Sequence, residues 1–170
     1  MARSDRLAWL IACGFGSGLA PRAPGTFGSL LGLGIGGVVL WATGSAAGGV
    51  IGLLAAAAAA TLAGLWAIAR VSDGDDHGWI VIDEIAGQLL AMLPLAGLAA
   101  GRDVRVALIG GVMAFVLFRL FDITKPGPVG WADRQHGGAG IMGDDLLAGL
   151  GAAIVLAGLR WLAAYWGGVA

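Results

Sequence analysis

Residues 46–69 contain no charged side chain, and this apolar stretch sharply limits the folds open to the chain. Roughly 20 helical residues cross a hydrocarbon core of about 30 Å. Residues 146–166 are apolar except for Arg160, and both stretches are predicted to span a membrane. The composition agrees: 58% of residues are hydrophobic and 12% are charged, whereas a soluble domain has about 25% charged residues. These values exclude a disordered chain and an ordinary cytosolic domain.

Three further apolar stretches are shorter or carry charges near their ends, namely residues 26–41, 85–100 and 104–121. Pro94 lies inside the second of these and is expected to kink it, which membrane helices tolerate. No segment alternates as the strands of a membrane barrel must. The sequence therefore predicts an all-α membrane bundle of about four to five spans that forms a single domain over residues 1–170.

Glycines spaced four residues apart are predicted to let helices pack closely; they are Gly32 and Gly36, then Gly44, Gly48 and Gly52. The net charge of −1 shows no basic excess, so no nucleic acid partner is expected. Cys13 is the only cysteine, which excludes an intramolecular disulfide. The short apolar piece at residues 7–13 is expected to lie at the membrane interface.

The positive charges are unevenly distributed between the two ends of the spans. In a five-span arrangement, Arg102, Arg105 and Arg160 lie at one face of the membrane and the other seven cations lie at the opposite face. Because cytoplasmic loops carry an excess of Lys and Arg, the N-terminus and the face with seven cations are predicted to be cytoplasmic.

The acidic residues form two groups, one between the second and third stretches and one between the fourth and fifth. The first group is Asp73, Asp75, Asp76, Asp83 and Glu84, and the second is Asp122, Asp133, Asp144 and Asp145. Five spans place both groups at the cytoplasmic face. Carboxylates near a low-dielectric boundary repel one another unless a cation neutralises them. The pattern predicts a metal site at the membrane surface.

Residues 14–29 are rich in glycine and contain two prolines. Helix is therefore not expected before Thr26, which would cap the first span. A glycine-rich loop at a helix N-terminus offers backbone N–H groups to a phosphate, and Arg22 would add a charged donor. A plain hinge explains the same residues equally well, so both interpretations remain open.

Asp83 and Glu84 begin an apolar helix, where acidic residues also suit the helix dipole. Three apolar residues (Ile80–Ile82) precede the pair, which predicts that the carboxylates are partly buried. Buried acids need a cation or a proton, and hard oxygen ligands suit Mg²⁺. A metal or catalytic role is therefore favoured over capping, whereas the upstream acids at positions 73, 75 and 76 are expected to be solvated.

Arg119, Asp122 and Lys125 are spaced three residues apart, so a helix would align them on one face. The row is either an ion-pair ladder at the membrane surface or a carboxylate between two cations that grip phosphate oxygens. Asp144 and Asp145 are expected to begin the last span as the other acidic pair begins the third.

Several blocks of this sequence closely resemble the phosphatidylglycerophosphatase A family. They are Gly16-Ser-Gly-Leu, Pro24-Gly-Thr-Phe-Gly-Ser29, Ile82-Asp-Glu-Ile-Ala-Gly87, Phe118-Arg-Leu-Phe-Asp-Ile-Thr-Lys-Pro126, and Asp133-Arg followed by His136-Gly-Gly-Ala-Gly-Ile-Met-Gly-Asp-Asp-Leu-Leu-Ala-Gly149. The resemblance runs from about residue 14 to residue 150. It implies an all-α, Mg²⁺-dependent phosphatase of the bacterial inner membrane that converts phosphatidylglycerophosphate into phosphatidylglycerol.

The resemblance also implies roles for individual residues. The acids expected to hold one or two Mg²⁺ are Asp83, Glu84, Asp122, Asp144 and Asp145, and water is expected to attack the phosphorus. The phosphoryl oxygens would be stabilised by Arg119, Lys125 and Arg134. The headgroup would be seated by Thr26 and Ser29, and His136 is a candidate for phosphate contact or proton transfer. Attack by a carboxylate nucleophile ranks second to attack by water.

Two other classes of protein fit some of these features. A small membrane cation transporter would also gather carboxylates, but deep within its spans, whereas the acids here lie at the span ends. A non-catalytic membrane subunit would use the polar loops for docking, and it gives no reason for two acidic pairs beside Arg119 and Lys125.

Overall fold

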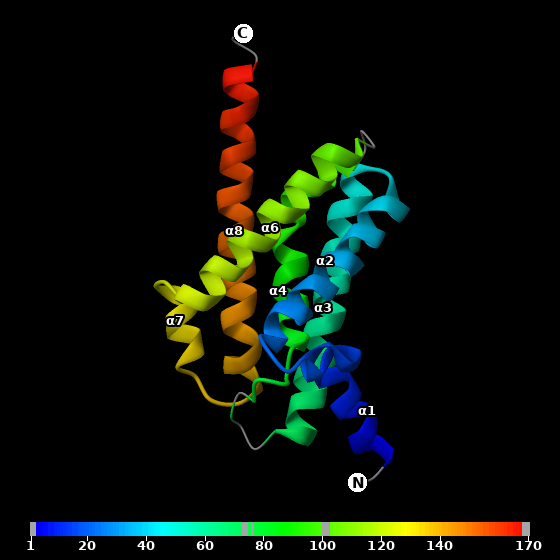
Figure 1. Cartoon of the computed structure of the whole chain (residues 1–170), viewed down its shortest axis with the longest axis vertical. Helices are drawn as coiled ribbons and strands as arrows, with labels where there is room; N and C mark the ends of the chain where they lie inside the picture. Colours follow the sequence, from blue (N-terminus) through cyan, green and yellow to red (C-terminus); the bar gives the residue numbers. More distant parts are fainter. Residues whose placement is uncertain (1–2, 73–74, 76, 100–102, 168–170) are drawn as a thin grey trace.

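The computed structural model describes residues 3–72, 75, 77–99 and 103–167, and over these residues it is all-helical (Figure 1). Four helices are long and apolar enough to cross a membrane: α2 (Pro24–Thr43), α3 (Ala46–Val71), α6 (Val104–Thr124) and α8 (Gly138–Gly167). The shorter helices are α1 (Arg3–Ala12), η1 (Gly14–Leu19), α4 (Ile82–Ala91), η2 (Leu93–Leu95), α5 (Ala96–Ala99) and α7 (Pro128–Asp133). The predicted class, an all-α polytopic membrane protein, is confirmed.

Large apolar side chains on the outer faces of the long helices are exposed. They include Val38, Ile51, Leu62, Leu108 and Ile154, the last of which is 73% exposed. Lipid tails are as apolar as these side chains, so a bilayer removes the cost that water would impose. The exposed surface is therefore the surface of a membrane protein rather than that of a soluble domain.

The first long helix begins two residues earlier than predicted, at Pro24, and Thr26 does not cap it. Ala23 occupies the cap position with a φ of 50°, and the Thr26 N–H donates to the Ala23 carbonyl at 2.9 Å. Proline suits the first helical position because its missing N–H would have no partner there and its φ is already helical.

The third apolar stretch does not form one long kinked helix. Helix α4 ends at Ala91, and the turn that follows contains Pro94. Helix α4 packs mainly against α8, α2 and α3, and it lies in the middle of the bundle (Figure 1). Because it is surrounded by the long helices, most of its residues are buried.

Glycines make the close packing of α2 on α4 possible. A Cβ atom at Gly32 would lie 3.0 Å from the Ile85 carbonyl oxygen, and one at Gly36 would contact the Met92 thioether. The predicted packing role of these two glycines is confirmed. Gly44 is different: with a φ of 58° it ends α2, because a left-handed residue at a helix C-terminus costs glycine little.

The last long helix begins at Gly138, well before the predicted start at residue 146. Asp144 and Asp145 therefore lie about two turns into the helix, and the expectation that they begin the span is wrong. The preceding Gly137 has a φ of 78°, and its carbonyl accepts a hydrogen bond from the Ile141 N–H. The glycine-rich loop therefore ends at the first turn of the helix.

Helix α1 packs beside the C-terminal half of α3, where Ala8 and Ala12 are buried together with Ala67. The start of α4, the end of α6 and the start of α8 lie toward the same end of the molecule as the N-terminus (Figure 1). The parts of α4, α6 and α8 that carry acidic residues therefore lie at one end of the bundle (Figure 1).

The backbones of α4 and α8 are in close contact where Gly149 faces Gly87, because a Cβ atom at Gly149 would collide with the Gly87 carbonyl oxygen. We expect Gly149→Ala to lower the free energy of unfolding by about 1–3 kcal/mol, the usual cost of overpacking. Gly158→Ala on the same helix is the matched control, since a Cβ atom there meets nothing within 4 Å. Chemical unfolding in detergent measures both, and equal stability of the two variants would contradict the prediction.

Candidate active site

The first turn of α4 holds Asp83 and Glu84 inside the protein. The residues before them anchor the chain: Ile80 and Val81 are buried, and the Val81 N–H donates to the Ala12 carbonyl at 2.9 Å. Asp83 is only 5% exposed. The predicted burial of this pair is confirmed, and it follows from the apolar residues that precede it.

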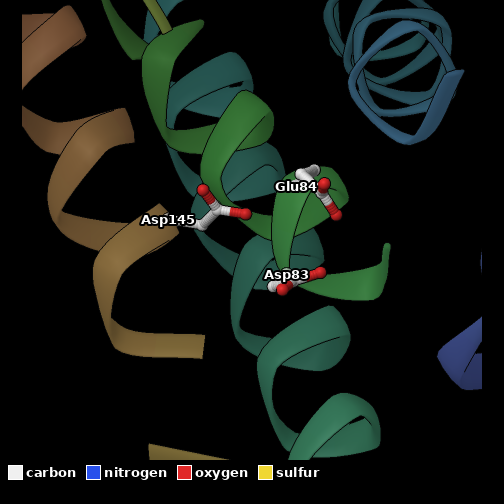
Figure 2. Close-up of side chains that lie close together, drawn as sticks. All are labelled: Asp83, Glu84 and Asp145. Atoms are coloured by element: carbon white, nitrogen blue, oxygen red, sulfur yellow. The ribbon is translucent and has the colours of Figure 1, made fainter. Parts of the chain in front are cut away.

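Helix α8 brings a second acidic pair to the same place. Asp144 and Asp145 are 6% and 3% exposed, and a Cβ atom at Gly87 would lie 2.5 Å from the Asp145 carbonyl oxygen. The missing side chain at Gly87 thus allows α8 to approach α4. Figure 2 shows the Asp145 carboxylate extending from α8 toward the α4 helix that holds the other acids.

The five acids expected to hold a metal converge in two overlapping groups. Carboxylate oxygens of Asp83, Glu84 and Asp145 lie within 4.8 Å of one another, and so do those of Asp122, Asp144 and Asp145. Asp145 belongs to both groups. The structure therefore brings together acids that are 62 positions apart in the sequence (145 − 83 = 62).

The donor set fits a hard divalent cation. Glu84 Oε2, Asp144 Oδ1 and Asp145 Oδ1 are buried and accept no hydrogen bond from any residue in the described part of the chain. Buried polar atoms normally have a partner, and carboxylate oxygens are the ligands that Mg²⁺ and Ca²⁺ prefer. A cation among these oxygens would supply the missing partner and would reduce the repulsion between like charges.

Arg119 lies beside the carboxylates and is held by the first turns of α2. Its Nη1 atom is 2.5 Å from Asp122 Oδ2 and 4.0 Å from Glu84 Oε1, and it donates to Ser29 Oγ at 3.4 Å. A side chain at Gly25 would collide with the Glu84 carboxylate. The glycine-rich segment thus contributes to the site through Gly25, a residue that the sequence analysis did not single out.

Lys125 does not continue the row of Arg119 and Asp122. Helix α6 ends at Thr124, and Lys125 has a φ of 45°, which turns its side chain toward other acids. Its Nζ atom is 2.6 Å from Asp133 Oδ1 and also contacts Asp144. Burial alone would lower the pKa of Lys125, but these two carboxylates outweigh it and hold the pKa above its usual value. Lys125 therefore remains a positive charge at neutral pH.

The remaining predicted residues lie at the outer side of the cluster. Arg134 and His136 are exposed after α7, and His136 lines a small pocket of about 90 Å³ together with Asp133 and Asp144. Thr26 is half-buried in the first turn of α2. Of the three acids expected to be solvated, Asp75 is exposed, and positions 73 and 76 lie outside the described residues.

The sequence analysis missed Gln88 as a candidate. It is one helical turn beyond Glu84, it is fully buried, and neither of its amide atoms has a hydrogen-bond partner among the described residues. The sequence did contain a signal for this residue, because Gln88 is a polar residue in an otherwise apolar stretch. It also lies four positions after an acid that was expected to be partly buried.

Taken together, the helices and the cluster define a class: a multi-span membrane protein with a buried carboxylate cluster that could hold a cation, next to two basic residues. The particular family is shown by comparison. The chain belongs to the phosphatidylglycerophosphatase A family, whose sequence model matches residues 10–160. This confirms the predicted family and the class of membrane lipid phosphatase.

Three curated relatives are each 36% identical to this chain. A Bacteroides thetaiotaomicron protein described as "Putative phosphatidylinositol-3-phosphatase" aligns with 95% of this chain and 99% of its own length. Proteins described as "Phosphatidylglycerophosphatase A" align from Haemophilus influenzae (92% of this chain, 88% of the relative) and Escherichia coli (86% and 80%). No solved structure matches the chain.

Divalent cations are expected to stabilise this protein. At a free concentration one hundred times the Kd, Mg²⁺ should add about 2.7 kcal/mol to the free energy of unfolding. Asp145→Asn should weaken Mg²⁺ binding at least about tenfold, because a residue common to both acidic groups is neutralised. Thermal melting in detergent with increasing Mg²⁺ measures both effects.

The matched control for this prediction is Asp103→Asn. Asp103 caps the start of α6 through hydrogen bonds from Arg105 and Val106, and asparagine caps equally well. This variant removes a carboxylate at the other end of the bundle and should keep the full response to Mg²⁺. A wild-type protein whose melting temperature no divalent cation raises would rule out the metal site.

Proposed function

We propose that this protein hydrolyses the terminal phosphate monoester of phosphatidylglycerophosphate to give phosphatidylglycerol. One observation carries the proposal: a family member gathers five carboxylates, three of them buried, beside Arg119 and Lys125 at one end of its apolar helices. A phosphomonoester on a lipid headgroup lies just outside the hydrocarbon, so it can reach such a site while its acyl chains stay in the bilayer.

The metal proposed for the site is Mg²⁺, held by Asp83, Glu84, Asp122, Asp144 and Asp145. Bound there, it would neutralise phosphoryl oxygens and favour formation of a hydroxide nucleophile from water. This assignment is supported by buried oxygens of Glu84, Asp144 and Asp145 that accept no hydrogen bond from the described residues.

The chain's own residues bind the phosphoryl group and accept the proton of the attacking water. Arg119 and Lys125 supply positive charge near the phosphoryl oxygens, and Lys125 does so as a permanent cation. Asp145, which lies in both acidic groups, is the best-placed base for water. Ser29 orients Arg119 through its hydroxyl group.

The exposed outer residues are proposed to receive the rest of the headgroup. His136 lines the small pocket next to Asp144, and Arg134 is exposed two positions before it; a second phosphate of the lipid would meet positive charge there. Thr26 is proposed to contact the headgroup from the start of α2. The excess of cations on this side of the spans supports a cytoplasmic active face in a bacterial inner membrane.

A phosphoinositide is the second candidate substrate, because one relative is described as a phosphatidylinositol-3-phosphatase. Both lipids present a phosphomonoester to the same set of cations. Phosphatidylglycerophosphate is preferred because the matching family and two of the relatives bear its name. A cation transporter is disfavoured, since the acids lie near the ends of the helices.

The purified protein should release phosphate from phosphatidylglycerophosphate micelles with Mg²⁺ present and stop when EDTA is added. Asp83→Asn and Asp145→Asn should each lower the rate at least about 100-fold, because phosphoryl-transfer catalysis depends on electrostatic stabilisation of this kind. Phosphate release, measured beside phosphatidylinositol 3-phosphate as a competing substrate, tests both the reaction and the choice of lipid.

Asp103→Asn serves as the control and should keep the wild-type rate. Normal turnover by both site variants would eliminate the carboxylate site as the reaction centre. Faster turnover of phosphatidylinositol 3-phosphate would replace the proposed substrate with the phosphoinositide.

A further inference from the structure

Gln88 is a buried amide that makes no hydrogen bond to the described part of the chain. Its side chain is 0% exposed, and both Nε2 and Oε1 lack a hydrogen-bond partner among the described residues. A buried polar group in this state destabilises a folded protein. Such a group in a native structure calls for an explanation, and a ligand absent from the structure is one.

The position of Gln88 connects it to the acidic site. It follows Glu84 by four residues on α4, so the two side chains lie on the same helix face, about one turn apart. This face is turned toward α2, because a Cβ atom at Gly32 would lie 3.0 Å from the Gln88 Cβ, and one at Gly25 would meet the Glu84 carboxylate.

Arg119 extends toward the same face of α2. Its Nη1 atom donates to Ser29 Oγ, and Ser29 is three residues, about 4.5 Å of helical rise, before Gly32. Arg119 Nε is itself buried and has no acceptor among the described residues. Gln88 and Arg119 thus leave buried N–H donors without acceptors along one short segment of α2.

The atoms that have no partner among the described residues fall into three chemical sets. The first set is the carboxylate oxygens of Glu84, Asp144 and Asp145, acceptors that need a cation. The second is Gln88 Nε2 and Arg119 Nε, donors that need an oxyanion, and the third is Gln88 Oε1, a neutral acceptor that needs a donor. A metal ion alone would satisfy only the first set. A tetrahedral phosphoryl group beside the cation would satisfy the second.

We propose that Gln88, together with Arg119 Nε, binds a phosphoryl oxygen in the active site. The inference rests on the proposed function and extends it, because it names a residue that recognises the phosphoryl group. Gln88 Nε2 donates to the oxyanion, and Oε1 accepts from the O–H of the phosphoryl group in its monoanionic form. The ligand chemistry is shared by the lipid headgroup and by free inorganic phosphate.

The experiment uses the full chain with Gln88→Met, Gln88→Glu and the control Leu90→Met. Methionine keeps the volume and removes the hydrogen bonds, whereas glutamate keeps the size and replaces the NH₂ donor with an oxygen. Leu90 is a core residue of the same helix, and exchange of leucine for methionine is well tolerated.

Three quantities are measured for each protein in detergent with Mg²⁺. They are kcat/KM for the lipid, the inhibition constant of inorganic phosphate, and the rise in melting temperature that inorganic phosphate produces. Both Gln88 variants should lose about 10- to 100-fold in kcat/KM, the worth of a hydrogen bond to a charged group. They should also weaken inhibition by phosphate and lose its effect on melting, whereas Leu90→Met should behave as wild type.

Two further readouts separate binding from a structural role. Mg²⁺ affinity of Gln88→Met should stay within twofold of wild type, because the cation ligands are untouched. Its melting temperature without ligand should equal or exceed that of wild type, since an unpartnered buried amide has been removed. A lower melting temperature that accounts for the lost activity would overturn the proposal.

Failure of this inference can be told apart from failure of the proposed function. If the wild-type protein releases no phosphate from the lipid but is still stabilised by inorganic phosphate, the proposed reaction is wrong. In that case, loss of the stabilisation in Gln88→Met still supports phosphate binding by Gln88. If phosphate stabilises wild type and both Gln88 variants equally, or stabilises none of them, the role of Gln88 is refuted.

Discussion

The close approach of α4 to α8 is the constraint on which the rest of this protein depends. Gly87 and Gly149 lack side chains where the two backbones meet, and this contact places Asp145 against the acids of α4. Like charges held together inside a protein repel strongly, because little water is present to screen them. The helix contact that forms the site therefore also brings together negative charges that a bound cation would neutralise.

The basic residues of the site neutralise only part of this negative charge. Arg119 is shared between Asp122 and Glu84, and Lys125 between Asp133 and Asp144. Buried ion pairs of this kind gain stability only when the remaining atoms are also satisfied. Among the described residues, carboxylate oxygens of the acids lack partners, Gln88 and Arg119 hold N–H donors without acceptors, and Gln88 Oε1 lacks a donor. Unpaired carboxylate oxygens suit a cation, and unpaired N–H donors suit an oxyanion.

Much of the site could be predicted because the chemistry of its residues is visible in the chain. The burial of Asp83 followed from the apolar residues before it, and the spacing of Arg119 and Asp122 predicted their contact. Lys125 could not be placed in this way, because the helix ends one residue earlier and a left-handed backbone turns the side chain toward Asp144. The early start of α8 could not be predicted, because it lies in a glycine-rich segment whose intrinsic propensity disfavours a helix. Tertiary packing outweighs this propensity and extends the helix to Gly138.

The sequence by itself determined that this protein is a membrane helix bundle with acidic residues gathered at one end, because apolar length and charge placement are properties of the chain. Only the tertiary structure decided that Asp145 joins both acidic groups, that Gly25 makes room for Glu84, and that Gln88 lacks a hydrogen-bond partner among the residues the structure describes. These facts depend on distances between helices that are far apart in the sequence. Such distances arise from the packing of small residues, which no single segment encodes.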